Sequence, residues 1–203
     1  MISYHYKYVF IHITKTGGSS IEKALVDDSQ IFRSNKWRYE GKVFNAPLNH
    51  LTWKQILRSQ ALNKYQQSRF HKFTFVRNPW DRVISECFCP HIQGVYKSCE
   101  TITDRIKRVC ELSIKGHAAH FLPQVNYIDE CCDIVVGKFE QLSDEFQKIC
   151  DIVRVSNVTL NHTNKGIKQR ERKPYQFYYD KDTIDLVKNT YRQDIDRFEY
   201  SFE

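Results

Sequence analysis

Hydrophobic and polar positions along the chain form two kinds of pattern, short apolar runs and longer segments with helical spacing. The apolar runs are rich in β-branched and aromatic residues and predict strands at 8–13, 71–77 and 133–136. The first run contains no turn former, as expected of a strand buried on both faces of a parallel sheet. Apolar residues with helical spacing predict helices over 19–25, 51–62, 78–88, 101–120, 143–153 and 180–198.

Helix-start signals follow the strands. Ser19 stands three residues before Glu22, which matches a capping box, and Ser143 is expected to cap the helix after the third strand. Asn78 is expected to cap the helix that contains Pro79 in its first turn. A strand, a turn and a helix therefore occur in this order more than once.

This alternation predicts an α/β fold, a three-layer sandwich with a central, mainly parallel sheet. The 203 residues suffice for one core, and no repeat, linker or low-complexity tract divides them. We therefore expect a single domain over residues 1–203, with residues 27–47 as a loop that holds one short strand at most.

The net charge of +7 favours an anionic partner, which could be a nucleotide, a nucleic acid, an acidic glycan or a membrane surface. Much of the excess lies in "NKGIKQRERK", residues 164–173, where five basic residues accompany one acid. A solvated loop would account for this stretch equally well.

Hydropathy and cysteine content predict a soluble protein. No apolar run approaches the roughly 20 residues that span a bilayer, and the first residues do not resemble a secretory signal. Seven cysteines, an odd number, fit reduced thiols in the cytoplasm, unless the chain is a soluble catalytic fragment of a membrane-anchored enzyme. Their spacing lacks paired C-x-x-C units, so buried thiols are favoured and no metal is expected.

The turn in "YVFIHITKTGGSSIEKAL" has the composition of an anion-binding loop. Glycines at 17 and 18 between a strand and a helix would let an anion approach the main chain, near the positive end of the helix. Lys15 adds a charge, and hydroxyl donors come from Thr16, Ser19 and Ser20. Lysine precedes the glycines here, which differs from a Walker loop. A tight connection with a surface lysine is the alternative.

A second candidate anion site follows the second strand. Positions 78, 82 and 85 share one helix face, so Ser85 can point back toward Arg77. An arginine with a nearby hydroxyl suits a phosphate. The alternative is that Arg77 pairs with Asp81 while Ser85 is simply exposed.

These two segments together resemble a known family. "FIHITKTGGSSIEKAL" resembles the 5′-phosphosulfate loop, and "FTFVRNPWDRVISECF" the 3′-phosphate motif, of carbohydrate sulfotransferases of the Golgi and bacterial type. The resemblance extends over most of the chain, is weakest at 27–70 and 87–115, and differs from the usual loop in having Thr14 where a proline is common. It implies a P-loop NTPase-like sulfotransferase fold.

The resemblance also implies a donor, 3′-phosphoadenosine 5′-phosphosulfate (PAPS), and roles for the two loops. Its 5′-phosphosulfate would be held by Lys15, Thr16, Gly17, Gly18, Ser19 and Ser20, with Lys15 stabilising the leaving phosphate. Its 3′-phosphate would be held by Arg77 and Ser85, and by Lys165 from a loop that closes over the nucleotide. The acceptor would be a hydroxyl of a carbohydrate or other glycosylated molecule.

A hydroxyl acceptor needs a general base, and histidine has a suitable intrinsic pKa. His50, in "PLNHLTW", lies where related enzymes place a catalytic histidine, and it is our predicted base. His120, in "HFLPQ", is a predicted substrate contact and the alternative base, whereas His12 is expected to be a packed strand residue.

Two other classes of function stay open from the residues alone. One is a nucleotide-binding or nucleic-acid-binding module without catalysis, although the basic and aromatic motifs of RNA binders are missing. The other is an atypical nucleotide kinase, which would need a Walker lysine and a magnesium-binding acid that the motifs do not supply.

Overall fold

The computed structural model describes residues 1–25, 31–32, 50–160 and 173–203. The chain divides into two compact units. The sheet unit comprises Met1–Val76 and Asn126–Asn164, and the helical unit comprises Arg77–Val125 and Lys165–Glu203. A single domain over residues 1–203 was predicted from the sequence. The division into two compact units does not test this prediction.

A mixed sheet organises the sheet unit, with the strand order β3-β1-β2-β4-β5. The three longer strands, β2, β4 and β5, pair in parallel, and the short β1 pairs antiparallel with both β2 and β3. The strands are β1 (Ile2–Ser3), β2 (Tyr8–Ile11), β3 (Ile31–Phe32), β4 (His71–Val76) and β5 (Ile134–Lys138). The predicted strands and the α/β class are confirmed, and the antiparallel edge was not foreseen.

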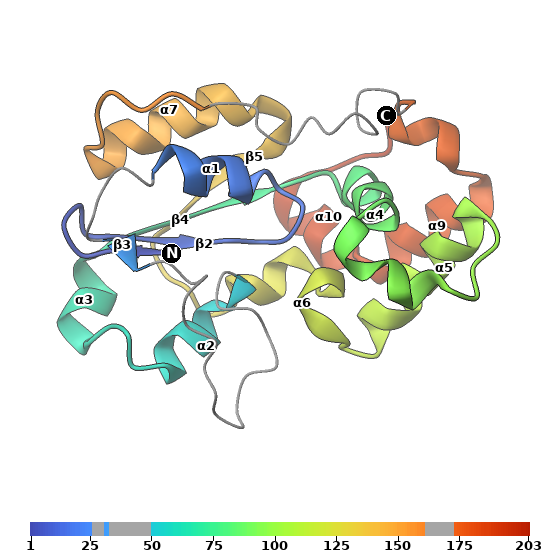
Figure 1. Cartoon of the computed structure of the whole chain (residues 1–203), viewed down its shortest axis with the longest axis horizontal. Coiled ribbons are helices and arrows are strands. Elements are labelled where there is room, and N and C mark those ends of the chain that lie inside the picture. Colours follow the sequence, from blue (N-terminus) through green and yellow to red (C-terminus); the bar gives the residue numbers. More distant parts are fainter. Residues whose placement is uncertain (26–30, 33–49, 161–172) are drawn as a thin grey trace. The chain divides into compact units, whose positions relative to one another are not determined.

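Helices lie on both sides of this sheet (Figure 1). Helices α1 (Gly18–Ala24) and α7 (Leu142–Val153) lie on one side, and α2 (Trp53–Arg58) and α3 (Lys64–Arg69) lie on the other. Alternate residues of β2 and β4 face α1 and α7, and one cluster joins Tyr8, Phe10, Phe73, Phe75, Ile21 and Phe146. The intervening residues Val9 and Ile11 are also fully buried, so β2 is covered on both faces as predicted.

Three predicted helix boundaries are wrong. Helix α1 begins at Gly18 with Gly17 as its N-cap, so Ser19 does not form the expected capping box. Helix α7 begins at Leu142 after the 3-10 turn η5 (Phe139–Gln141), which places Ser143 inside the helix. The helix predicted over 51–62 is two shorter helices, because Asn63 and Gln66 form a capping box that starts α3 separately.

The helical unit is built from α4 (Pro79–Cys87), α5 (Ile102–Ile114), α6 (Ala118–Phe121), α9 (Lys181–Thr190) and α10 (Arg192–Phe198). Its core cluster includes Trp80, Ile84, Ile106, Phe121, Val187 and Tyr191. Shorter 3-10 turns are η3 (Pro90–Tyr96), η4 (Gln124–Tyr127, which spans the boundary between the units) and η6 (Tyr175–Tyr178).

Local signals predicted the start of α4 correctly and the lengths of two other helices incorrectly. The Asn78 side chain accepts a hydrogen bond from the Trp80 amide at 3.0 Å and caps α4. The helix predicted over 101–120 ends at Ile114, shortly before Gly116 adopts a φ of 64°. The helix predicted over 180–198 is interrupted at Tyr191, where φ is −111° and ψ is 28°.

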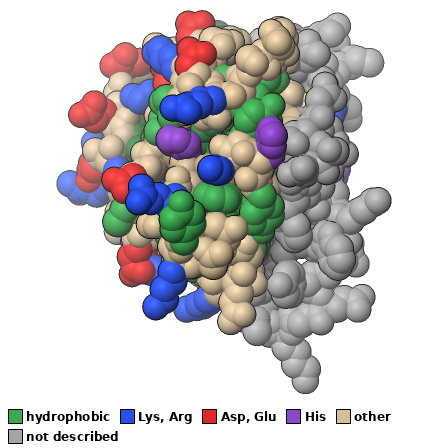
Figure 2. Space-filling view, turned by 90° about the vertical axis from the view of Figure 1, so that its left-hand side faces the viewer, with side chains coloured by type: hydrophobic (Ala, Val, Ile, Leu, Met, Phe, Trp, Pro, Cys, Tyr) green, Lys and Arg blue, Asp and Glu red, His purple; other side chains and the backbone are tan. Residues whose placement is uncertain are grey.

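Charged side chains of both signs cover the surface that Figure 2 draws. Lys and Arg side chains alternate there with Asp, Glu and hydrophobic side chains, without a continuous field of one sign. None of the helices in the described residues has both the length and the apolar character needed to span a membrane.

The core of the sheet unit yields a stability prediction. Phe146 is 2% exposed, whereas Ile152 on the same helix is 42% exposed. Phe146→Ala should lower the free energy of unfolding by about 3–5 kcal/mol, because it removes a buried ring and leaves a cavity. Ile152→Ala should cost at most about 1 kcal/mol. Urea unfolding followed by circular dichroism measures both, and similar losses would contradict the assignment of Phe146 to the core.

Candidate functional site

The turn between β2 and α1, together with the first three residues of α1, contains six of the predicted site residues and has an unusual backbone. Lys15 and Gly17 both have positive φ, at 64° and 84°. The Thr16 hydroxyl donates a hydrogen bond to the Ile13 carbonyl at 2.9 Å, and the Ser20 amide donates to the Gly17 carbonyl at 2.9 Å. Left-handed residues within a turn are an element of the backbone concavities that bind anions. The turn shares this feature with such concavities, and its role in anion binding stays a prediction.

The polar residues of this turn and of the start of α1 differ in the exposure of their side chains. Thr16 and Ser20 are buried, Lys15 is half-buried and Ser19 is exposed. The hydroxyl proton of Thr16 is already used inside the turn, so this residue shapes the loop. Lys15 and Ser19 are the polar side chains of the turn that reach the surface.

Both glycines are required by contacts with protein. A Cβ at Gly17 would lie 2.8 Å from a methyl carbon of Leu142, and its positive φ already disfavours other residues. A Cβ at Gly18 would lie 2.1 Å from the ring of His12. The sequence analysis explained these glycines by close approach of an anion. The structure adds that their missing side chains make room for α7 and for His12.

His12 joins the end of β2 to helix α1. Its ring is buried, and its Nδ1 lies 2.9 Å from the Glu22 carboxylate. Burial alone would raise the pKa of Glu22, but the hydrogen bond and charge of His12, together with the charge of the chain's N-terminus, lower it below its ordinary value. His12 is packed, as predicted, but it is also hydrogen-bonded to an acid, which the sequence analysis missed because it assigned Glu22 to a capping box.

His50, the predicted base, lies against His12 in the sheet unit. The centroids of the two rings are 4.5 Å apart, in an edge-to-face arrangement. The Nδ1 of His50 lies 3.2 Å from the main-chain oxygen of His12. A carbonyl oxygen only accepts hydrogen bonds, so Nδ1 of His50 is the donor in this contact. His50 is therefore next to the residue whose ring covers Gly18.

Arg77, the first residue of the helical unit, binds an acid in the first turn of α4. Its Nε and Nη2 both donate to one carboxylate oxygen of Asp81, at 2.8 and 2.7 Å. The pairing with Asp81 that the sequence left as an alternative is therefore present. Ser85 is 2% exposed, so the other half of that alternative, an exposed serine, is wrong.

The main chain of Arg77 is held by a buried polar network that the sequence analysis did not foresee. The side chain of Gln124 accepts from the Arg77 amide and donates to the Arg77 carbonyl, both at 2.9 Å. Asp194 in turn accepts from the amides of Gln124 and Val125, at 2.8 and 2.9 Å. The pKa of Asp194 is raised above its ordinary value because the group is buried. The charge of Arg82 and the hydrogen bonds from the two amides lower this pKa, but by less than burial raises it. A signal was available, since Asp194 is seven residues after Val187 and thus on the apolar face of the C-terminal segment.

His120, the predicted substrate contact, pairs with a buried acid within the helical unit. Its Nδ1 lies 3.0 Å from the Glu86 carboxylate, and its main-chain oxygen accepts from Arg82 at 3.3 Å. Its side chain retains 21% exposure. Lys165, the predicted 3′-phosphate contact from the basic segment, lies outside the described residues.

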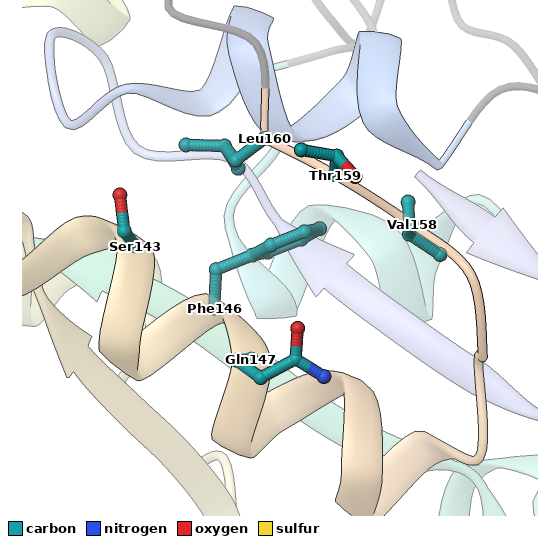
Figure 3. Close-up of a pocket in the computed structure, with 6 residues that line it drawn as sticks. All are labelled: Ser143, Phe146, Gln147, Val158, Thr159 and Leu160. Carbon is teal, nitrogen blue, oxygen red and sulfur yellow. The ribbon is translucent and has the colours of Figure 1, made fainter.

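One pocket within the sheet unit has a volume of about 220 Å³ and lies between α7 and the segment 158–160 (Figure 3). It is lined by Ser143, Phe146, Gln147, Val158, Thr159 and Leu160. Among the described residues, neither a charged residue nor a predicted site residue lines this pocket. It is therefore separate from the turn that carries Lys15.

Comparison with known proteins identifies the family. A family model described as "Sulfotransferase family" matches residues 1–201, so the chain belongs to this family. No curated protein and no solved structure matches the chain. The membership supports sulfuryl transfer from a sulfate donor to a hydroxyl acceptor as the general activity, and it agrees with the resemblance drawn from the two motifs.

The His12 and Glu22 pair yields a pH prediction. The pKa of Glu22 is below its ordinary value of 4.5, so the folded state binds fewer protons than the unfolded state near that pH. Its contribution to stability is therefore complete above about pH 4.5 and is lost as the pH falls through the folded-state pKa. Glu22→Gln should flatten this acid limb. Urea unfolding as a function of pH measures the effect, with the exposed Glu100→Gln as control. An unchanged acid limb in Glu22→Gln would show that the pair does not contribute.

Proposed function

We propose that this chain transfers a sulfuryl group from PAPS to a hydroxyl of a carbohydrate or other glycosylated acceptor. The observation that carries the proposal is the position of His50, beside the β2 to α1 turn that holds Lys15, in a chain of the sulfotransferase family. A base and a cation on one unit are what this reaction needs. The parallel β2 and β4 with α1 after the turn support a P-loop-like version of the fold.

In this proposal the two ends of the donor use the two sets of residues predicted from the motifs. The turn residues from Lys15 to Ser20 bind the 5′-phosphosulfate, through main-chain amides and through the side chains of Lys15 and Ser19. Arg77 binds the 3′-phosphate, since a guanidinium presents five N–H donors and can contact a phosphate as well as Asp81. Ser85 and Lys165 complete that contact. Because Ser85 is buried, its part requires the covering side chains to move.

The reaction is an in-line substitution at sulfur. A bond forms between the acceptor oxygen and sulfur, the bond between sulfur and the bridging phosphate oxygen breaks, and the acceptor proton goes to the base. Lys15 stabilises the negative charge that develops on the leaving phosphate oxygen. Holding both reactants in line supplies much of the acceleration, as in phosphoryl transfer.

The hydrogen bond of His50 supports its role as the base. With Nδ1 donating to the His12 carbonyl, a neutral His50 carries its lone pair on Nε2, which is the atom proposed to accept the acceptor proton. Glu22 keeps His12 in place through its own hydrogen bond. The His12 main-chain oxygen, which orients His50, therefore belongs to a residue that is held by Glu22 and whose ring packs against Gly18.

The proposed donor can be tested by thermal stabilisation of the whole chain. The desulfated donor, 3′-phosphoadenosine 5′-phosphate (PAP), at about 100 times its Kd should raise the Tm by roughly 5–10 °C. AMP and ATP should raise it far less, because neither has a 3′-phosphate to occupy Arg77. Equal shifts with AMP and PAP would remove the 3′-phosphate assignment and favour a nucleotide-binding module or kinase.

The proposed base can be tested by substitution. His50→Ala should lower kcat about 10²–10⁴-fold, because general base catalysis is lost, and should leave PAP binding nearly unchanged. Lys15→Ala should lower both turnover and PAP binding. Transfer of labelled sulfate to candidate hydroxyl acceptors and calorimetry with PAP measure these effects. The exposed His5→Ala is the control. Full turnover in His50→Ala would transfer the role to another residue, with His120 the first to examine.

A further inference from the structure

Three residues with metal-binding side chains come together in the helical unit, on elements other than the turn that carries Lys15. Glu86 is in α4, Cys89 follows the end of that helix, and His120 is in α6. Each offers one ligand atom, and these atoms all lie within 4.8 Å of one another. The sequence analysis expected no metal because no third ligand was evident beside the histidines. Folding supplies an acid and a thiol that the sequence spacing did not connect to His120.

Burial makes this cluster unusual. Glu86 is 1% exposed and Cys89 is 2% exposed. One oxygen of the Glu86 carboxylate contacts His120 at 3.0 Å, whereas the other, Oε1, is buried and has no hydrogen-bond partner among the described residues. A buried carboxylate oxygen without a partner is costly, and such atoms in folded proteins call for an explanation. A cation bound at Oε1 would supply one.

The surroundings of the cluster contain a second buried polar atom and two arginines. The buried hydroxyl of Tyr96 is a second polar atom without a partner in the described part of the chain. Burial raises the pKa of Tyr96, and the nearby Glu86 carboxylate raises it further, whereas the charge of Arg105 lowers it. The neighbouring cations are Arg105, which donates to the Cys87 carbonyl, and Arg82, which donates to the His120 carbonyl. In these two contacts the arginines bind main-chain oxygens.

We propose that Glu86, Cys89 and His120 bind a Zn²⁺ ion. A thiolate, an imidazole and a carboxylate are the ligand types that zinc prefers, and calcium or magnesium would favour oxygen ligands throughout. Zinc bonds of about 2.0–2.3 Å place tetrahedral ligands roughly 3.3–3.8 Å apart. The separations of up to 4.8 Å therefore need side-chain movements of about an ångström. The pairing of His120 with Glu86 would give way to two bonds to the ion.

The local backbone positions the ligands for this role. The Cys89 amide donates to the Glu86 carbonyl at 2.8 Å, so these two residues are one turn apart. The Arg82 guanidinium holds the carbonyls of His120 and Leu122, at 3.3 and 3.0 Å, and thereby fixes α6 beside α4. An ion would join α4 to α6. Three protein ligands leave the fourth tetrahedral position for water or another small ligand.

Cobalt substitution tests the proposal without reference to sulfuryl transfer. The whole chain is treated with a chelator and titrated with Co²⁺, a spectroscopic substitute for Zn²⁺. We expect one ion per chain, with the visible bands of tetrahedral cobalt and a near-ultraviolet band from thiolate to cobalt. Zn²⁺ should displace the cobalt and raise the Tm, since it binds the folded state. Absence of stoichiometric binding, or binding without the thiolate band, would overturn the proposal.

Substitutions identify the ligands, each with a matched control. Cys89→Ser should abolish the thiolate band and weaken Co²⁺ binding about 100-fold or more, given that partners outside the ligand set alone change affinity 10–100-fold. Cys87→Ser, equally buried and two residues away, should retain the band. His120→Ala should weaken binding similarly, and His117→Ala, on an exposed residue, should not. Equal effects in a variant and its control would refute the assignment.

A third substitution covers the case in which a cysteine variant does not fold. Glu86→Gln nearly preserves the size of the side chain and removes its charge, so it should retain the circular dichroism of the parent chain and weaken Co²⁺ binding at least tenfold. Unchanged affinity for Co²⁺ in this variant would show that Glu86 is not a ligand and would contradict the proposed site. Because these measurements do not depend on PAPS, a negative result would not affect the proposed transfer reaction.

Discussion

The parallel pairing of β2 with β4 is the constraint on which the rest of the sheet unit depends. It aligns Tyr8 with His71 and Ile11 with Thr74, and the Thr74 hydroxyl adds a bond to the Ile11 carbonyl at 2.7 Å. Parallel strands end at the same edge of a sheet, so the turn after β2 and the carboxyl end of β4 share that edge. Burial of both faces of β2 leaves little freedom to shift this register, because a shift by one residue would exchange the faces.

The turn after β2 is maintained by packing as much as by its own conformation. Gly17 is closed in by Leu142 of α7, and Gly18 by the ring of His12. His12 is held by Glu22 and supports His50 through its carbonyl oxygen. The residues proposed to bind an anion and the residue proposed to accept a proton are therefore parts of one packed assembly, in which the folding of the unit sets their positions before any ligand binds.

Two buried polar networks in the described part of the helical unit differ in how completely their groups are hydrogen-bonded. In the first, both carboxylate oxygens of Asp194 accept main-chain amides, and Gln124 satisfies both main-chain groups of Arg77. In the second, Glu86 has a partner for one oxygen only. A satisfied network is typical of structural support, whereas a buried polar atom without a partner calls for an explanation. This contrast is the physical basis for assigning a positioning role to Gln124 and a binding role to Glu86.

The sequence by itself determined the features that depend on neighbours along the chain. These are the buried strands β2 and β4, the glycine turn with its lysine, and the start of α4 at Asn78, because side-chain periodicity and capping are local properties. Tertiary structure decided the true starts of α1 and α7, the break at Tyr191, and the meetings of His12 with Glu22 and of Glu86 with Cys89 and His120. Those contacts join residues far apart in the chain or on different elements. These contacts form only when the strands pair in register and the helices pack. The free energy of strand pairing and helix packing cannot be inferred from the local sequence pattern.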